Sequence, residues 1–156
     1  AWTALRHALW PDADAAVLNR ARVLDPGVDW VLGDALSHDF GRRFDLVASI
    51  ATLHHLPDLA AGLRRLAELT APGGRLVVIG LARADRLVDL LPDLVAVPAN
   101  LARRAQRGYW QHTAPTCWPP PHSYTDVRRT VTAELPAARY RRLLFWRYCV
   151  QWRKPA

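Results

Sequence analysis

The amino-acid sequence predicts an α/β domain built on a parallel β-sheet that helices cover. Two nearly continuous apolar runs, FDLVASI at 44–50 and RLVVIGL at 75–81, flank an amphipathic helical pattern at 57–70, with short breaks between them. Such runs indicate interior parallel strands, because an interior strand is buried on both faces. A strand, a helix and a second strand joined in this way predict a right-handed crossover.

The N-terminal part continues the same alternation of helix and strand. Val17, Ala21 and Leu24 share one helical face within residues 12–24, and Asp14 is suited to cap that helix. Residues 28–34 alternate apolar and polar side chains, which favours a strand near a sheet edge. The helix at 57–70 then places Pro57 in its first turn, and its core face carries Leu59, Leu63, Leu66 and Thr70.

Residues 82–107 have a helical composition that Pro92 and Pro98 interrupt, with more apolar side chains than one stripe holds. Helices that cover the sheet are the favoured interpretation, and an apolar lid over a substrate pocket is the alternative. Because Asp89, Asp93 and the two prolines break the apolar run, we expect no membrane span there and no membrane partner.

The C-terminal third begins with an aromatic, proline-rich stretch at 108–124, which predicts a long and functional loop. Candidate substrate contacts in that loop are Tyr109, Trp110, His112 and His122. Ser123 and Asp126 then predict a capping box at the start of a helix. Residues 138–154 predict a strand pair that closes the sheet, with Tyr140, Leu144 and Trp146 on one side.

Length and composition favour one globular domain over residues 1–156, with 51% hydrophobic and 22% charged residues. The net charge is +7, but the arginines are scattered, so nucleic-acid binding is not expected. The mixture of aromatic residues and arginines at 138–154 could instead stack on RNA bases. Two cysteines without metal-ligand spacing or a secretory signal predict no metal site and a reduced, cytoplasmic protein.

Acids and small residues follow three of the predicted elements, where ligands bind in open parallel sheets. Asp12 precedes the first helix, GDA occupies 33–35, and SIATLHH occupies 49–55 ahead of LTAPGGRLVVIG at 69–80. Together these motifs resemble the class I S-adenosylmethionine-dependent methyltransferases, especially their small-molecule branch. The resemblance implies a Rossmann-like parallel sheet with helices on both faces, S-adenosylmethionine as cofactor, and a small-molecule methyl acceptor. It leaves the acceptor's identity and the oligomeric state open.

The resemblance also assigns residues to parts of the cofactor. Asp12 would accept hydrogen bonds from both ribose hydroxyls, since one carboxylate offers two acceptor oxygens. Within Gly33, Asp34 and Ala35, the acid would take the adenine amino group, and the backbone of Ser49 and Ile50 would line the methionine part. The alternatives are that Asp12 is a second capping acid, Asp34 a turn residue, and Ser49 a small residue needed for packing.

His54 and His55 would lie at the methyl end of the cofactor. Methyl transfer mainly needs proximity and orientation, but a hydroxyl or ammonium acceptor also needs a base, and histidine titrates in the useful range. Either histidine is therefore a candidate to orient the acceptor or to take its proton. The alternative is that one of them caps the following helix or packs beneath the cofactor.

The sequence departs from the family at its N-terminal side. The family's glycine-rich loop follows a first strand, but no glycine precedes Asp12, and eleven residues cannot hold these elements. The resemblance therefore implies an N-terminally incomplete fold with an exposed edge at the strand 44–50. A fragment of a longer methyltransferase is the favoured explanation. The others are a site completed by a second chain and a non-catalytic protein that binds a partner or RNA.

Overall fold

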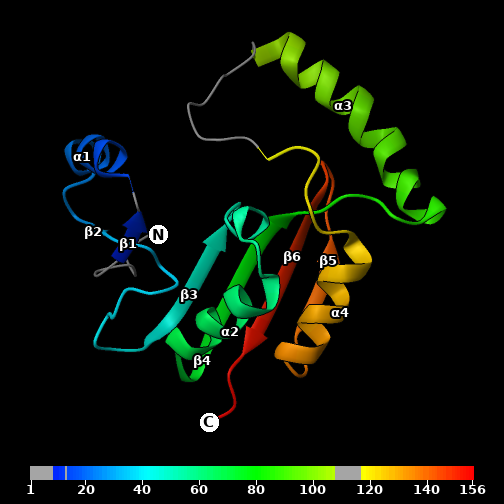
Figure 1. Cartoon of the computed structure of the whole chain (residues 1–156). Helices are drawn as coiled ribbons and strands as arrows, with labels where there is room; N and C mark the ends of the chain where they lie inside the picture. Colours follow the sequence, from blue (N-terminus) through cyan, green and yellow to red (C-terminus); the bar gives the residue numbers. More distant parts are fainter. Residues whose placement is uncertain (1–8, 13, 108–116) are drawn as a thin grey trace. The chain divides into compact units, whose positions relative to one another are not determined.

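A computed structural model describes residues 9–12, 14–107 and 117–156 (Figure 1). The chain divides into two compact units, residues 1–41 and residues 42–156. The prediction of one domain over 1–156 stays a prediction.

Unit 1 is a parallel strand pair with one helix. Its elements are β1 (Leu9–Asp12), α1 (Ala15–Leu24) and β2 (Asp29–Leu32). The strands pair in parallel, with Asp12 opposite Leu32. Asp14 caps α1, because its carboxylate accepts a hydrogen bond from the Ala16 backbone nitrogen at 2.8 Å. The predicted helix, its cap and the predicted strand are thus confirmed.

Unit 2 contains a four-stranded sheet in the order β3-β4-β6-β5. Its strands are β3 (Phe44–Ile50), β4 (Thr70–Leu81), β5 (Arg139–Arg142) and β6 (Arg147–Arg153). β3 pairs with β4 in parallel, whereas β6 is antiparallel to both β4 and β5. The predicted α/β fold, with a parallel sheet and a C-terminal antiparallel strand pair, is therefore confirmed.

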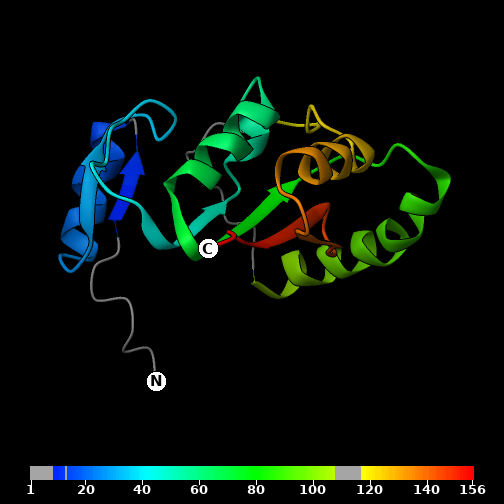
Figure 2. The ribbon, with the colours of Figure 1, turned by 90° about the horizontal axis from the view of Figure 1, so that it is seen from below.

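The core of unit 2 lies between this sheet and the helices α2 (Leu59–Leu69) and α4 (Tyr124–Glu134). Figure 2 shows both helices on the same side of the sheet. Alternate strand residues face them, because successive side chains of a strand point to opposite faces. The buried residues include Leu59, Leu63, Leu76, Val78, Val127, Val131, Tyr148 and Val150. Arg64 of α2 and Glu134 of α4 also pair at 2.7 Å.

Pro57 precedes the N-cap residue Asp58, so the prediction that it lies in the first turn of α2 was wrong. The helix ends at Leu69, as the predicted break at 71–74 requires. Residues 71–74 belong to β4, but their pairing with β3 is irregular and becomes regular from Arg75. Gly73 in this stretch has a φ of 73°, and its nitrogen donates to the Lys154 carbonyl oxygen. Leu144 and Trp146 lie in the turn between β5 and β6, so they do not continue the strand face of Tyr140.

The strand predicted as interior, β3, lies at the edge of its four-stranded sheet. Leu46 and Ile50 on this strand are 49% and 54% exposed. This agrees with the exposed edge that the resemblance implied. The apolar sequence of β3 indicates that both faces of the strand suit burial, but it does not indicate which strands lie beside it.

The segment after β4 forms a short 3-10 helix, η2 (Leu87–Leu90), and the helix α3 (Leu91–Arg107), which contains Pro98. Asp89 of η2 pairs with Arg142 of β5 at 3.0 Å. The side chains of Leu94, Val95, Val97 and Leu101 are 47% to 70% exposed. The favoured prediction, that these apolar residues cover the sheet, is therefore wrong for α3. No helix of the described residues is long and apolar enough to cross a membrane.

Candidate functional site

Two of the predicted cofactor acids come together at the carboxyl ends of β1 and β2. The Gly33 backbone nitrogen donates a hydrogen bond to the Asp12 carbonyl oxygen at 3.0 Å. Asp12 ends β1, and Asp34 follows β2 by two residues. Because the strands are parallel, both acids leave the sheet at the same edge. Unit 1 thus presents the acidic half of the predicted site.

Asp12 is half-buried, and one of its carboxylate oxygens is engaged locally. Its Oδ1 accepts a hydrogen bond from the Asp14 backbone nitrogen at 2.8 Å, while Oδ2 has no partner among the described residues. The N-cap of α1 is Asp14, and Asp12 supports it from outside the helix by accepting from the Asp14 nitrogen, which agrees with the interpretation of Asp12 as a second acid at this helix start. One oxygen of Asp12 remains as an acceptor for a ligand.

Asp34 is exposed and does form a turn. Its Oδ1 accepts from the Leu36 nitrogen at 2.9 Å, and its carbonyl oxygen accepts from the nitrogens of Ser37 and His38. The turn role of Asp34 is confirmed. The turn uses one carboxylate oxygen of Asp34, and the other oxygen can accept from a ligand. A Cβ at Gly33 would lie 3.0 Å from His38 Nδ1, so the close approach of the His38 ring favours glycine at this position. Ala35 is half-buried beside it.

In unit 2, the carboxyl end of β3 turns sharply into a short 3-10 helix, η1 (Leu53–His55). The nitrogen of Ala51, whose φ is 54°, donates to the Ile79 carbonyl oxygen of β4 at 2.7 Å. Ser49 is 8% exposed and pairs in register with the buried Val78, whereas Ile50 is 54% exposed. The packing interpretation of the Ser49 side chain is therefore supported, and only its backbone is left for a ligand.

The histidine pair forms η1. His54 is buried and His55 is exposed, with ring centroids 4.1 Å apart. Burial first, and the neighbouring His55 second, lower the pKa of His54 below its ordinary value of 6.5. Among the described residues, His54 Nδ1 is buried without a hydrogen-bond partner. Neither histidine caps α2, because Asp58 does so through the Ala61 nitrogen at 2.9 Å.

The structure describes one of the four predicted substrate contacts. Tyr109, Trp110 and His112 lie outside the described residues. His122 is half-buried, and its carbonyl oxygen accepts from the Arg83 nitrogen at 3.0 Å. No group of three or more His, Cys, Asp or Glu among the residues that the structure covers could hold a metal ion.

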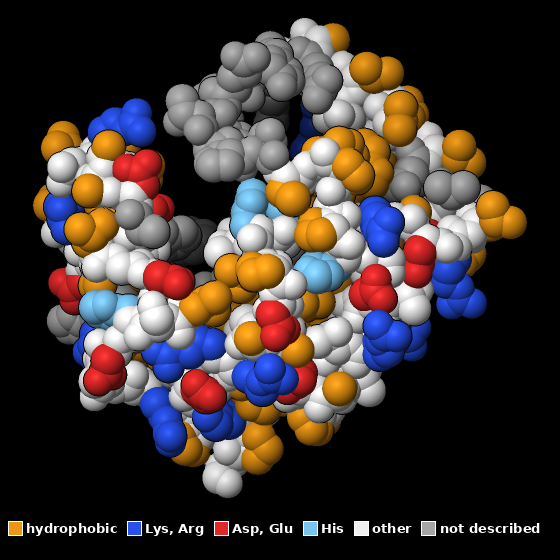
Figure 3. All heavy atoms as spheres, in the orientation of Figure 1, with side chains coloured by type: hydrophobic (Ala, Val, Ile, Leu, Met, Phe, Trp, Pro, Cys, Tyr) orange, Lys and Arg blue, Asp and Glu red, His pale blue; other side chains and the backbone are white. Residues whose placement is uncertain are grey.

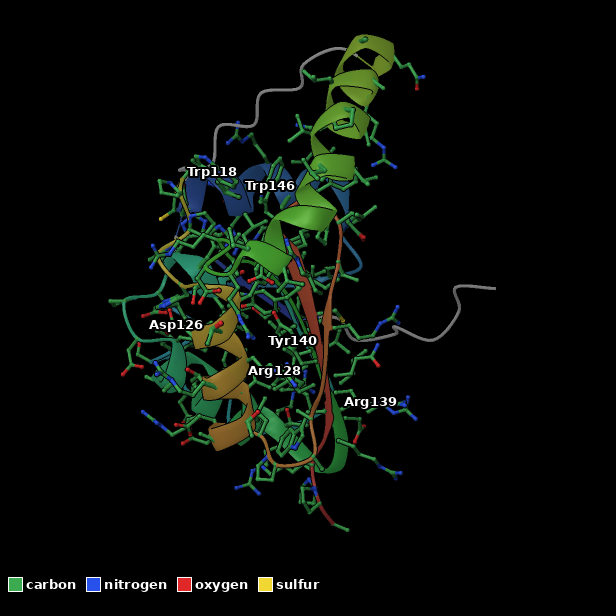
Figure 4. The ribbon with its side chains drawn as sticks, turned by 90° about the vertical axis from the view of Figure 1, so that its right-hand side faces the viewer. Trp118, Asp126, Arg128, Arg139, Tyr140 and Trp146 are labelled. Carbon is green, nitrogen blue, oxygen red and sulfur yellow. The ribbon has the colours of Figure 1, made fainter. Side chains whose placement is uncertain are left out.

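Sequence reasoning missed an aromatic pair at the carboxyl end of β4. Trp118 and Trp146 contact each other edge to face, with centroids 5.4 Å apart (Figure 4). The Trp146 carbonyl oxygen accepts from the Ala82 nitrogen just beyond β4. The β4–β6 register, which the sequence does not show, places Leu81 opposite Arg147 and so puts the turn beside this end of the sheet.

Comparisons with known proteins show which family the chain resembles. A family model described as a methyltransferase domain matches residues 3–78. An uncharacterized methyltransferase of Mycobacterium tuberculosis is 38% identical over 147 residues, which cover 92% of this chain and 74% of the relative. A trans-aconitate 2-methyltransferase of Methylobacterium radiotolerans is 36% identical over 110 residues, which cover 66% of this chain and 38% of that enzyme.

Solved structures are similar in fold. The N-methyltransferase NodS of Bradyrhizobium japonicum, in complex with S-adenosyl-L-homocysteine, matches 95% of this chain and 66% of its own with a TM-score of 0.57 at 18% identity. A possible exported protein of Bordetella parapertussis matches 95% of this chain and 53% of its own with a TM-score of 0.64 at 20% identity. The family model, the mycobacterial relative and the fold agree with one another. The chain therefore belongs to the class I S-adenosylmethionine-dependent methyltransferases.

Proposed function

We propose that this methyltransferase acts on a small-molecule acceptor and that the predicted residues hold its cofactor. The observation that carries the proposal is the hydrogen bond from the Gly33 nitrogen to the Asp12 carbonyl oxygen, which sets two acids side by side at one sheet edge. The relative named trans-aconitate 2-methyltransferase supports a small acceptor.

The residues of unit 1 fit the polar parts of S-adenosylmethionine. Asp12 keeps Oδ2 for a ribose hydroxyl, and Asp34 keeps one carboxylate oxygen for the adenine amino group. Gly33 and Ala35 supply backbone beside these acids. A carboxylate that accepts from a neutral donor forms a charge-assisted hydrogen bond, which is stronger than a neutral one.

The residues of unit 2 are assigned to the reacting end. The backbone of Ser49 and Ile50 would line the methionine part, since the Ser49 side chain is buried. The cofactor supplies a methyl group on a positively charged sulfur. The protein's task is to hold the acceptor in line and to remove its proton where it carries one.

We assign that proton transfer to the histidine pair. The lowered pKa of His54 keeps its imidazole neutral at neutral pH, so a ring nitrogen can accept a proton. His55 is exposed, and its ring is tilted by 39° against the His54 ring at 4.1 Å. As the exposed member of the pair, His55 would orient the acceptor. Tyr109, Trp110 and His112 remain candidate acceptor contacts.

Calorimetric titration with S-adenosylhomocysteine tests the cofactor assignment without knowledge of the acceptor. We expect saturable binding by the parent chain and binding weaker by about tenfold or more in Asp34→Asn, because a hydrogen bond to a charged group contributes about 1.5–3 kcal/mol. Asp39→Asn is the matched control, since Asp39 forms a similar turn with the Gly41 nitrogen at 2.8 Å.

Two results would count against the proposal. Equally weakened binding of S-adenosylhomocysteine in Asp34→Asn and Asp39→Asn would contradict the assignment of Asp34 to the adenine amino group. A folded parent chain that binds no S-adenosylhomocysteine would overturn the claim that this polypeptide is itself an enzyme, and would favour the non-catalytic, partner-binding or RNA-associated alternative.

A further inference from the structure

An aromatic pair lies at the carboxyl end of β4, outside the residues assigned to the cofactor and to proton transfer. The rings of Trp118 and Trp146 meet edge to face with centroids 5.4 Å apart, and Trp118 is 61% exposed. Figure 3 shows hydrophobic side chains along α3 as well, at the upper right, but the large exposed ones of that helix are leucines and valines. Among the described residues, Trp118 is the aromatic member of the exposed large hydrophobic side chains. The pair therefore offers a ligand a flat π-system, which the aliphatic surface does not.

The turn that carries Trp146 has a strained backbone. Phe145 and Trp146 have φ values of 61° and 57°, a region that hairpin turns normally fill with Gly, Asn or Asp. For bulky side chains such values are rare and cost free energy, and they recur at ligand-binding sites. The Leu143 nitrogen donates to the Arg147 carbonyl oxygen at 2.8 Å and closes the turn, while the Trp146 carbonyl oxygen accepts from the Ala82 nitrogen at 3.0 Å. The strained turn thus holds the Trp146 ring at the end of β4.

The two aromatic residues of the turn have different partners. The Arg103 guanidinium lies over the Phe145 ring, 5.2 Å from its centroid, whereas the Trp146 ring meets Trp118. The exposed part of the aromatic group is therefore the Trp118 ring. Aromatic rings gain free energy from stacked or edge-to-face contact beyond the area that they bury, so this surface favours a ligand with an aromatic ring over an aliphatic one.

The aromatic pair and the histidine pair lie at the same end of the sheet of unit 2. The Ala51 nitrogen, just before η1, donates to the Ile79 carbonyl oxygen of β4. Ala82, three residues further along the same strand direction, donates to Trp146. At about 3.3 Å per residue, these two contacts lie about 10 Å apart along β4. A small molecule of one or two rings can therefore contact side chains from both places.

We propose that Trp118 and Trp146 bind the methyl acceptor and that this acceptor carries an aromatic ring. The exposed face of Trp118 stacks on the ring, and the group to be methylated lies toward the histidine pair. This inference rests on the proposed function, because it concerns the acceptor of the same reaction. Trp118 belongs to the stretch 108–124, for which the sequence predicted a functional loop.

Two ring compounds of the same carbon skeleton test the proposal. Saturation-transfer NMR measures the dissociation constants of 2-naphthol and of its saturated analogue, decahydro-2-naphthol, with and without saturating S-adenosylhomocysteine. The test variant is Trp118→Leu, which keeps an apolar side chain, and Trp118→Phe restores an aromatic one. The control is Leu144→Ala, which removes a 46% exposed apolar side chain from the same turn.

We expect the parent to bind 2-naphthol more tightly than the saturated analogue. Trp118→Leu should weaken binding of 2-naphthol by about twofold to tenfold, the range of an aromatic pair, with little change for the saturated analogue. Trp118→Phe and the control should keep most of the preference.

Equal binding of the two compounds by the parent would overturn the proposal, and so would a preference that Trp118→Leu leaves unchanged, because Trp118 would then act through its area or through the fold. A parent chain that binds no S-adenosylhomocysteine would instead overturn the proposed function. The comparison of the two compounds without S-adenosylhomocysteine still decides whether the tryptophan pair binds aromatic rings.

Discussion

His54 links one residue to the pH dependence of stability. Its pKa is lowered in the folded chain, first by burial and then by repulsion from His55. The unfolded state therefore binds more protons than the folded state between the lowered pKa and the ordinary value of 6.5. The contribution of neutral His54 to the stability is fully present above the unfolded pKa. It is lost as the pH falls through 6.5 toward the folded pKa. We predict that the parent loses stability from neutral pH to mildly acidic pH and that His54→Gln loses less.

Urea unfolding at a series of pH values measures this difference. His55→Gln serves as the comparison, since it removes only the smaller of the two causes and should keep most of the pH dependence. The burial argument fails if His54→Gln and the parent have parallel profiles. A flat profile for His55→Gln would instead make the neighbouring charge the main cause.

At the scale of single elements, the start of α4 depends on a reciprocal cap. The Asp126 nitrogen donates to Ser123 Oγ at 3.1 Å, and the Ser123 nitrogen donates to the Asp126 carboxylate at 3.2 Å. We expect Ser123→Ala to lower the free energy of unfolding by about 1 kcal/mol, the usual cost of removing an N-cap side chain. Thr132→Ala is the control, because Thr132 is an exposed hydroxyl residue inside the same helix.

The same cap predicts an acid response. Hydrogen bonds from Ser123 lower the pKa of Asp126 below its ordinary value of 3.8. Since the folded pKa is the lower one, this stabilisation is present above 3.8 and is lost as the pH falls through the folded pKa. The difference between the parent and Ser123→Ala in thermal unfolding should therefore shrink in strong acid. A difference that does not depend on pH would show that the hydroxyl acts without the carboxylate.

Elements that depend on local chemistry could be predicted from the sequence, and those that depend on neighbours could not. The strand at 44–50, the cap by Asp14 and the Ser123–Asp126 box follow from residue type and spacing. The edge position of β3 and the outward face of α3 depend on what lies beside them. Gly80 is a further case: a side chain there would overlap the buried Tyr148 ring, which only the β4–β6 register brings close.

The candidate site was predictable in the same uneven way. The family resemblance assigned the two acids, and the structure places Asp12 at the end of β1 and Asp34 two residues after β2. Spacing could not show that the Ser49 side chain is used by the core, that His54 is buried, or that Trp118 meets Trp146. Each of these depends on which face of an element is covered, so the tertiary packing decides it.

At the scale of the whole molecule, the assigned cofactor residues belong to both compact units. Asp12 and Asp34 lie in unit 1, whereas Ser49, Ile50 and the histidines lie in unit 2. Among the residues of unit 1 whose burial the structure describes, Leu18 is the buried one. A small unit with so little core is stabilised weakly by itself. A ligand that it binds should therefore raise its stability measurably.

Hydrogen exchange with and without S-adenosylhomocysteine tests whether both units take part. The amides to follow are Gly33 in unit 1, which donates to the Asp12 carbonyl oxygen, and Ala51 in unit 2, which donates to the Ile79 carbonyl oxygen. At about one hundred times the dissociation constant, a ligand stabilises the bound state by about 2.7 kcal/mol, so exchange through unfolding should slow by about a hundredfold. At the same ligand concentration, tenfold weaker binding by Asp34→Asn should reduce the slowing at Gly33 from about a hundredfold to about tenfold, and Asp39→Asn should keep the full effect. Protection at Ala51 alone would refute the assignment of Asp12 and Asp34 and would confine ligand binding to unit 2, whereas protection at Gly33 that Asp34→Asn reduces would support that assignment.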